Sequence, residues 1–131
     1  MEYFRARFPK TPIITGDLHS EMLNCDLLII DYPGSTLNIA MAMGVPTICY
    51  WSPDVWPLTD NAKSYFNALR EAEILFSTPK AAAAKVNEVH KKAQAWWSTP
   101  IVKEARLDWA NQFALAKRTW WVDWLRIISR V

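Results

Sequence analysis

The chain has 131 residues, about half of them apolar (51%), so it can bury one ordinary core but is too short for two full domains. Its formal net charge of +2 comes from charges of both signs mixed along the sequence, which argues against a nucleic-acid partner and against a funnel for acidic substrates. No signal peptide is evident, and the apolar runs are far shorter than the ~20 residues of a membrane span. We expect a soluble, cytoplasmic, single-domain protein.

Cysteine and histidine offer no metal-binding or redox pattern. Cys25 and Cys49 fall in segments that are expected to be buried, without CxxC spacing, and are interpreted as structural thiols. His19 and His90 lie on expected helices with no partner evident in the sequence, and surface positions are the simpler interpretation. We therefore expect neither a metal nor a cofactor.

The first half of the chain alternates apolar runs with turn signals. Three runs have the composition of parallel strands covered on both faces: Thr11–Thr15, Asp26–Ile30 and Pro46–Trp51. Between them, Asp17 can cap a short helix, and Ser35 can cap a second helix that ends at Gly44. This order predicts a parallel, right-handed βαβαβ unit over residues 1–57.

The second half, residues 58–131, is expected to be helical. Apolar residues keep helical spacing over 58–69, 82–96 and 102–113, which predicts three amphipathic helices. In the repeated tripeptide Ser-Thr-Pro, at 77–79 and 98–100, Thr78 and Thr99 are expected to cap the following helix, with proline in its first turn. The fold class is therefore α/β: three parallel strands with helices, followed by a helical C-terminal region.

The last segment, 119–131, has a narrow polar stripe, and Trp120, Trp121 and Trp124 lie on its broad apolar face. Three interpretations stay open for this face. It can pack within the protein and cross to another domain, lie on a membrane surface with arginines at the headgroups, or form a subunit contact.

Chemistry is expected where the second strand meets its helix, over residues 31–36. Ligands of open α/β sheets bind beyond the carboxyl ends of strands, where helix N-termini present unpaired amides to phosphate. Gly34 allows close approach, and Ser35 and Thr36 add hydroxyl donors. Neither GxxxxGK[ST] nor GxGxxG is present, and a purely structural cap is the alternative.

The stretch 34–48 resembles the donor-binding helix of glycosyltransferases with the glycosyltransferase B fold, in which a small-residue turn precedes a helix reading Glu-Ala-(three residues)-Gly-x-Pro and then a strand. Ala40, Gly44 and Pro46 match that pattern. Other motifs are similar to transferases of bacterial surface-polysaccharide biosynthesis clusters: Trp51-Ser52-Pro53-Asp54, Tyr65-Phe66, Phe76-Ser77-Thr78-Pro79 and Trp96-Trp97. The chain is thus identified as resembling the C-terminal half of such a Rossmann-like donor domain.

The resemblance implies a nucleotide-sugar substrate, with the donor phosphates at Gly34, Ser35 and Thr36. The family's ribose-binding glutamate falls on Ile39, so Asn38 is the nearest polar candidate. In the loop after the third strand, Trp51 or Trp56 would stack on the sugar ring, and Asp54 and Asp60 would accept hydrogen bonds from the sugar hydroxyls. The structural alternative is that Trp56 packs the loop down and Asp60 stabilises the next helix.

The expected function is nucleotide-sugar-dependent glycosyl transfer in bacterial surface polysaccharide synthesis, such as lipopolysaccharide. This chain would supply part of the donor site and be inactive alone, because the family's acceptor domain has no counterpart here. No catalytic residue is assigned, and Asp31 is interpreted as a solvated strand end. The alternative is a non-catalytic nucleotide- or sugar-binding or scaffold module, and a weaker one is a sugar-nucleotide epimerase. A homo-oligomer is expected through the first strand or the tryptophan-rich helix.

Overall fold

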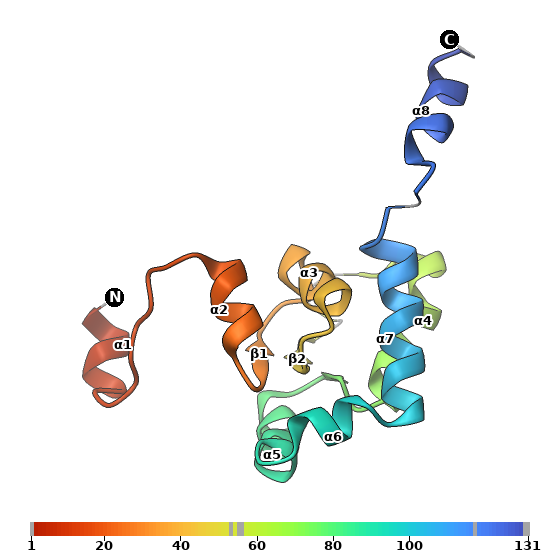
Figure 1. Cartoon of the computed structure of the whole chain (residues 1–131). Coiled ribbons are helices and arrows are strands. Elements are labelled where there is room, and N and C mark those ends of the chain that lie inside the picture. The colour runs from red at the N-terminus through yellow and green to blue at the C-terminus, as the bar shows by residue number, and fades with distance from the viewer. Residues whose placement is uncertain (1, 53, 55–56, 117, 130–131) are drawn as a thin grey trace.

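Figure 1 shows the computed structural model of the chain, which describes residues 2–52, 54, 57–116 and 118–129. In chain order the helices and strands are α1 (Glu2–Arg7), α2 (Leu18–Asn24), β1 (Leu28–Ile30), α3 (Ser35–Met43), β2 (Thr47–Tyr50), α4 (Asp60–Glu71), β3 (Leu75–Phe76), α5 (Pro79–Val89), α6 (Ala93–Trp97), α7 (Pro100–Phe113) and α8 (Trp120–Ile128).

The strands form one parallel sheet in the order β1-β2-β3. Leu28 pairs with Thr47, and Cys49 pairs with both Ile30 and Leu75, so β2 is the central strand. Helix α3 connects β1 to β2, and α4 connects β2 to β3. The predicted α/β class, with three parallel strands and a helical C-terminal region, is confirmed.

The prediction that Thr11–Thr15 forms the first strand is wrong. The segment has no strand structure, and Ile14 is 61% exposed. Pro12 has no amide hydrogen to give to a neighbouring strand, and β1 is itself an edge of the sheet. The third strand is β3, whose two residues lie in the half of the chain that was expected to be helical, so that expectation is wrong at Leu75 and Phe76. The edge strand on this side of the sheet is therefore β1 and not Thr11–Thr15. The homo-oligomer stays a prediction, with β1 or α8 as the expected contact.

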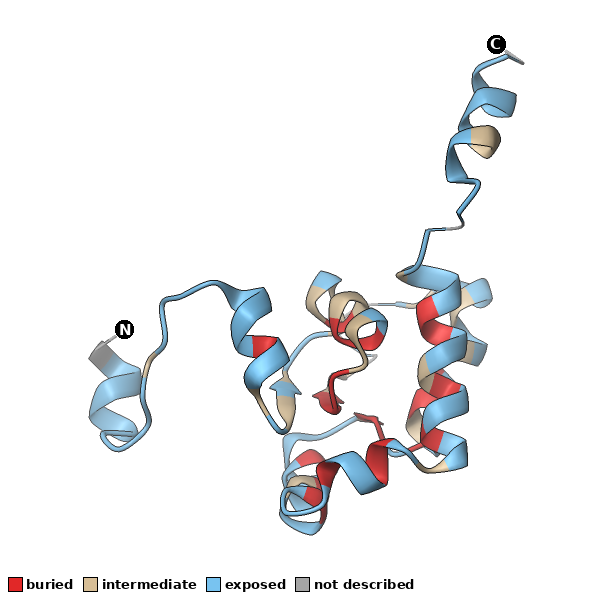
Figure 2. Ribbon diagram, viewed as in Figure 1, coloured by how far each residue is buried: buried red, intermediate tan, exposed pale blue. Residues whose placement is uncertain are grey.

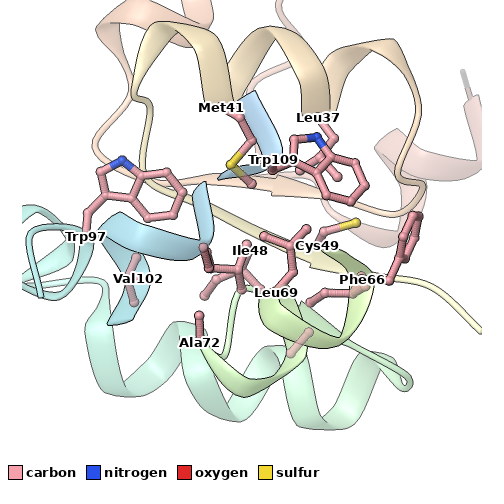
Figure 3. Close-up of a cluster of buried hydrophobic side chains, with 14 of the residues drawn as sticks. Leu37, Met41, Ile48, Cys49, Phe66, Leu69, Ala72, Trp97, Val102 and Trp109 are labelled. Carbon is pink, nitrogen blue, oxygen red and sulfur yellow. The ribbon is translucent and has the colours of Figure 1, made fainter. Parts of the chain in front are cut away.

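The core lies between the sheet and the helices of the second half. Figure 1 shows α3 and α5 on opposite sides of the sheet, and α7 packs against both α3 and α4. The fully buried side chains include Leu37, Ile48, Leu69 and Val102, which meet at the centre of this body (Figure 3). Burial of this apolar surface is the main stabilising term of the fold.

Several helix ends follow the predicted capping chemistry. Asp17 caps α2 by accepting a hydrogen bond from the Ser20 amide at 2.9 Å, and Gly44 ends α3 in the left-handed conformation with φ of 73°. Thr78 caps α5 by accepting from the Ala81 amide at 3.2 Å. Thr99 occupies the corresponding position before α7, but its hydroxyl donates to the carbonyl of Trp96 at 2.8 Å and does not cap the helix.

The helix predicted over 82–96 is divided into α5 and α6 at residues 90–92. After the break, α6 packs on the core, where the consecutive side chains Trp96 and Trp97 are both buried. Trp97 then donates its indole hydrogen to the Gly44 carbonyl at 2.8 Å. This hydrogen bond connects α6 to the end of α3.

The two terminal segments differ from this body: residues 2–24, which include α1 and α2, and residues 118–129, which include α8. In Figure 2 both are almost entirely exposed, and Figure 1 shows α1 and α8 projecting away from the sheet. Met22 of α2 is buried against Ala40 and Val45, but no residue of α8 is buried. Among the described residues, no helix has the length and apolar character needed to cross a membrane.

Candidate functional site

The carboxyl ends of β1, β2 and β3 lie at the same end of the sheet because the strands are parallel. We call this end of the sheet its carboxyl edge. Three connections leave from this edge: the turn at 31–34 before α3, the loop that begins at Trp51, and the turn at 77–78 before α5. This edge is where open α/β sheets bind ligands. The predicted donor-binding residues of the turn and of the loop therefore belong to the same end of the sheet.

The turn before α3 presents two amides, and not three, to a ligand. Gly34 is the N-cap residue, and its own amide donates to the Tyr32 carbonyl at 2.9 Å. The amides of Ser35 and Thr36 lie in the first helical turn, where no intrahelical acceptor exists. They also sit at the positive end of the helix dipole. The prediction that Ser35 caps α3 is wrong, because the helix starts at Ser35 and has no side-chain cap.

Gly34 has a packing role in this turn. A Cβ atom at Gly34 would lie 3.0 Å and 3.1 Å from two ring carbons of Tyr32. These distances are shorter than ordinary van der Waals contact, so the absence of a side chain at Gly34 lets the Tyr32 ring lie against the turn. The group that approaches Gly34 closely in this structure is therefore the Tyr32 ring.

Asn38 holds α3 to α7. Its Oδ1 atom accepts a hydrogen bond from the indole nitrogen of Trp109 at 2.9 Å. Trp109 is 3% exposed, and Figure 3 shows its ring among the buried apolar side chains. The oxygen that was expected to accept from ribose hydroxyls is therefore already accepting from a buried indole. Ile39, at the position of the family's glutamate, is half-buried against the small cluster of Met22, Ala40 and Val45.

Trp51 is buried at the end of β2 and does not offer a ring face to a sugar. It is 6% exposed and packs on Phe66, with 5.4 Å between ring centroids. Phe66 in turn meets Trp109 at 4.9 Å, edge to face. The placement of Trp51 in this aromatic cluster contradicts its predicted stacking role. Trp56, the other predicted stacking residue, lies outside the described residues.

Asp54 is exposed in the loop after β2, as a sugar-facing carboxylate should be. One oxygen of Asp54 accepts from the Ser52 hydroxyl at 3.2 Å, and the Asp54 amide donates to the same hydroxyl oxygen at 3.4 Å. Asp60 fits the structural alternative, since it occupies the first turn of α4 and pairs with Lys63 at 2.7 Å.

The carboxylate of Asp31 is exposed at the end of β1, as expected for a solvated strand end. Burial raises the pKa of the Cys49 thiol to about 12, and the negative charge of Asp31 adds to that shift. Cys49 is fully buried in β2, so it is an unreactive structural thiol, as the sequence predicted.

The histidines are also placed as expected. The Nδ1 atom of His90 lies 3.2 Å from the Val86 carbonyl and 3.1 Å from the Asn87 carbonyl, and both His19 and His90 are exposed. In the described part of the chain, no group of three or more His, Cys, Asp or Glu residues could hold a metal ion.

Two features away from the carboxyl edge were not found from the sequence. A polar hollow of about 450 Å³ lies at the amino end of the sheet, lined by Asp26 and residues 90–95. Lys85 is 6% exposed and pairs with Glu73 at 2.5 Å and Glu88 at 3.2 Å. Burial lowers the pKa of Lys85, but the hydrogen bonds to Glu73 and Glu88 outweigh it and raise the pKa overall.

The model of the LIC12162 family transferase matches residues 1–128, nearly the whole chain. A search of curated proteins and a search of solved structures returned no match.

Proposed function

The chain belongs to the LIC12162 family of transferases, and on that basis we propose that it takes part in nucleotide-sugar-dependent glycosyl transfer in bacterial surface polysaccharide synthesis. The carboxyl edge of its sheet would face the nucleotide-sugar donor and supply part of the donor site. The observation that carries the proposal is the start of α3, where the amides of Ser35 and Thr36 point out of the first helical turn at the edge of a parallel sheet.

This geometry suits the charge changes of glycosyl transfer. When the bond between the sugar C1 and the donor phosphate oxygen breaks, C1 bonds to an acceptor hydroxyl oxygen, and the hydroxyl proton is released to solvent or to a base. The electron pair of the broken bond stays on the phosphate oxygen, so the nucleotide leaves with extra negative charge. Amides that already point at this phosphate stabilise the developing charge without reorganising. Ser35 and Thr36 would have this role, and the exposed carboxylate of Asp54 would accept hydrogen bonds from the sugar hydroxyls. We assign no catalytic residue to the chain.

A non-catalytic binding or scaffold module is the second candidate. It is favoured by the pair at positions 38 and 39: Asn38 accepts from Trp109, and Ile39 has no polar atom in its side chain. With Ile39 apolar and the Asn38 oxygen bonded to Trp109, α3 lacks the free carboxylate with which the resembling transferases bind ribose. A scaffold module would keep the fold and bind no sugar nucleotide.

The substitution Ser35→Pro tests the turn directly. Proline removes the Ser35 amide hydrogen, is favoured at the first helical position, and is compatible with the extended conformation of Gly34 before it (φ −92°, ψ −154°). Ser35→Ala is the matched control, because it removes the hydroxyl and keeps the amide. We expect Ser35→Pro to weaken nucleotide-sugar binding by about tenfold or more and Ser35→Ala to weaken it much less.

The measurement is a thermal-shift titration of the purified chain with UDP-, GDP-, CMP- and CDP-sugars, since a ligand that binds the folded state raises its apparent stability. Unfolding in the absence of nucleotide shows that each variant is folded. Equal binding by Ser35→Pro and Ser35→Ala would remove the Ser35 amide from the site. No binding by the parent chain to any donor would favour the scaffold module.

A further inference from the structure

The C-terminal helix α8 exposes an unusually large apolar surface for its size. Six of its nine residues are large apolar side chains that are each more than half exposed: Trp120 (56%), Trp121 (54%), Trp124 (60%), Leu125 (58%), Ile127 (62%) and Ile128 (62%). Single exposed apolar residues are common on proteins, but a contiguous group of this kind marks an interaction surface.

The six side chains form one face of the helix. With 100° between successive residues, they occupy a continuous arc of about 160°, and Asp123, Arg126 and Ser129 lie on the other side. Asp123 and Arg126 pair along that polar stripe at 3.4 Å. Helix α8 is therefore amphipathic, with tryptophan as its main apolar residue and with its charged residues on the opposite side.

The charge around α8 indicates what kind of surface it meets. Residues 117–131 contain four basic residues and one acidic residue, a net charge of +3: Lys117, Arg118, Arg126 and Arg130 against Asp123. Residues 1–116 contain eleven basic and twelve acidic residues, a net charge of −1. The positive charge of the chain is thus concentrated on the segment that also carries the exposed tryptophans. A second α8 would bring the same positive charge, whereas an anionic surface complements it.

The combination of tryptophan and arginine fits the boundary between lipid and water. Tryptophan places its ring at the level of the lipid headgroups, and arginine is attracted to anionic headgroups. The helix is also free to meet a flat surface, because it projects from the body beyond α7 (Figure 1). With nine residues it is too short to cross a bilayer, so it would lie along the surface.

We propose that α8 binds the surface of a bilayer containing anionic phospholipid, with its six apolar side chains between the headgroups and with Arg118 and Arg126 beside the lipid phosphates. This proposal is independent of the nucleotide-binding proposal, because α8 shares no residue with the carboxyl edge of the sheet.

The test mixes the full chain with vesicles of phosphatidylcholine, with and without phosphatidylglycerol, and measures cosedimentation and tryptophan fluorescence. We expect binding that requires phosphatidylglycerol, accompanied by a blue shift. Trp120→Ser, Trp121→Ser and Trp124→Ser together should abolish both signals. The control is Tyr3→Ser with Phe4→Ser, which removes exposed aromatic rings from α1 and should leave binding unchanged. Arg118→Gln and Arg126→Gln should each weaken binding about fivefold.

Helix content measured by circular dichroism shows whether each variant is folded, and light scattering without lipid gives the oligomeric state. Equal sedimentation of the parent chain and the triple tryptophan variant would overturn the proposal. So would a parent chain that is a stable dimer without lipid, becomes a monomer in the triple variant, and does not sediment with anionic vesicles, because a second copy would then cover α8.

Discussion

The tryptophans of the central body and those of α8 have opposite environments in the same chain. Trp97 and Trp109 are 2% and 3% exposed, and each donates its indole hydrogen to an acceptor far away in sequence. The three tryptophans of α8 are all more than half exposed. An amphipathic sequence therefore predicts that a helix has an apolar face, but it does not identify what covers that face.

The N-terminal segment resembles α8 in this respect. Tyr3, Phe4 and Ile14 are exposed, and Phe4 has Phe8 as its aromatic neighbour at 5.0 Å between ring centroids. The body formed by the sheet, α3, α4, α5 and α7 contains most of the buried apolar side chains (Figure 2). We infer that the body determines the stability of the fold and that the terminal segments are available for other contacts.

The largest expected effect is on Trp109, which joins the aromatic cluster and the bond to Asn38. Trp109→Ala should lower the free energy of unfolding by about 3–5 kcal/mol, because it leaves a cavity and an unpaired Asn38 oxygen. Trp124→Ala in α8 should change it by less than about 0.5 kcal/mol. Chemical denaturation of the two variants measures both values. Similar losses in the two variants would contradict the division into a stabilising body and free terminal segments.

Alkaline pH should weaken the body through Cys49. The thiol ionises near pH 9 in the unfolded chain, but burial raises its pKa in the fold to about 12. The folded state therefore keeps the neutral thiol, and its stabilising contribution is complete below pH 9 and is lost between pH 9 and pH 12. The expected slope is about 1.4 kcal/mol per pH unit in that range.

The check on Cys49 is the pH dependence of urea unfolding between pH 8 and pH 11. Cys49→Ala should remove the part of the pH dependence between pH 9 and pH 11 that is due to this thiol. Cys25→Ala is the matched control, because Cys25 is only half-buried and lies outside the main core. A parent-like slope in Cys49→Ala would show that another group is responsible.

The parts of the fold that follow from short-range chemistry could be predicted from the sequence. Helix α3 is one example, since a small-residue turn and the left-handed Gly44 define its two ends locally. β3 could not be predicted, because two residues carry no periodic pattern and depend on the pairing of Cys49 with Leu75. The apolar composition of Thr11–Thr15 was misleading, because a strand also needs a neighbour to pair with.

The candidate site shows the same limit. The turn at Gly34–Thr36 was located correctly at a strand-to-helix junction, since that depends on chain order alone. The side to which Trp51 points depends on the register and end of β2, so its burial against Phe66 could not be deduced. The partner of Asn38 is 71 residues away, and no local pattern connects the two.

The smallest expected effect concerns that long-range bond. Asn38→Ala should lower the free energy of unfolding by about 1–2 kcal/mol, because the buried indole nitrogen of Trp109 loses its acceptor. Asn38→Asp keeps an acceptor oxygen at the same position and should lose less. Arg126→Gln breaks the exposed pair on α8 and should have no measurable effect on unfolding.

The same Asn38 variants separate packing from ligand binding. If Asn38 acts only through Trp109, Asn38→Asp should bind nucleotide-sugars in the thermal-shift titration as the parent does, because the bond between α3 and α7 persists. A variant that keeps its stability but loses nucleotide binding would show that the Asn38 carboxamide also contacts the donor. That outcome would restore the role that the sequence predicted for Asn38, and it would place the ribose beside the first turns of α3 together with the phosphates.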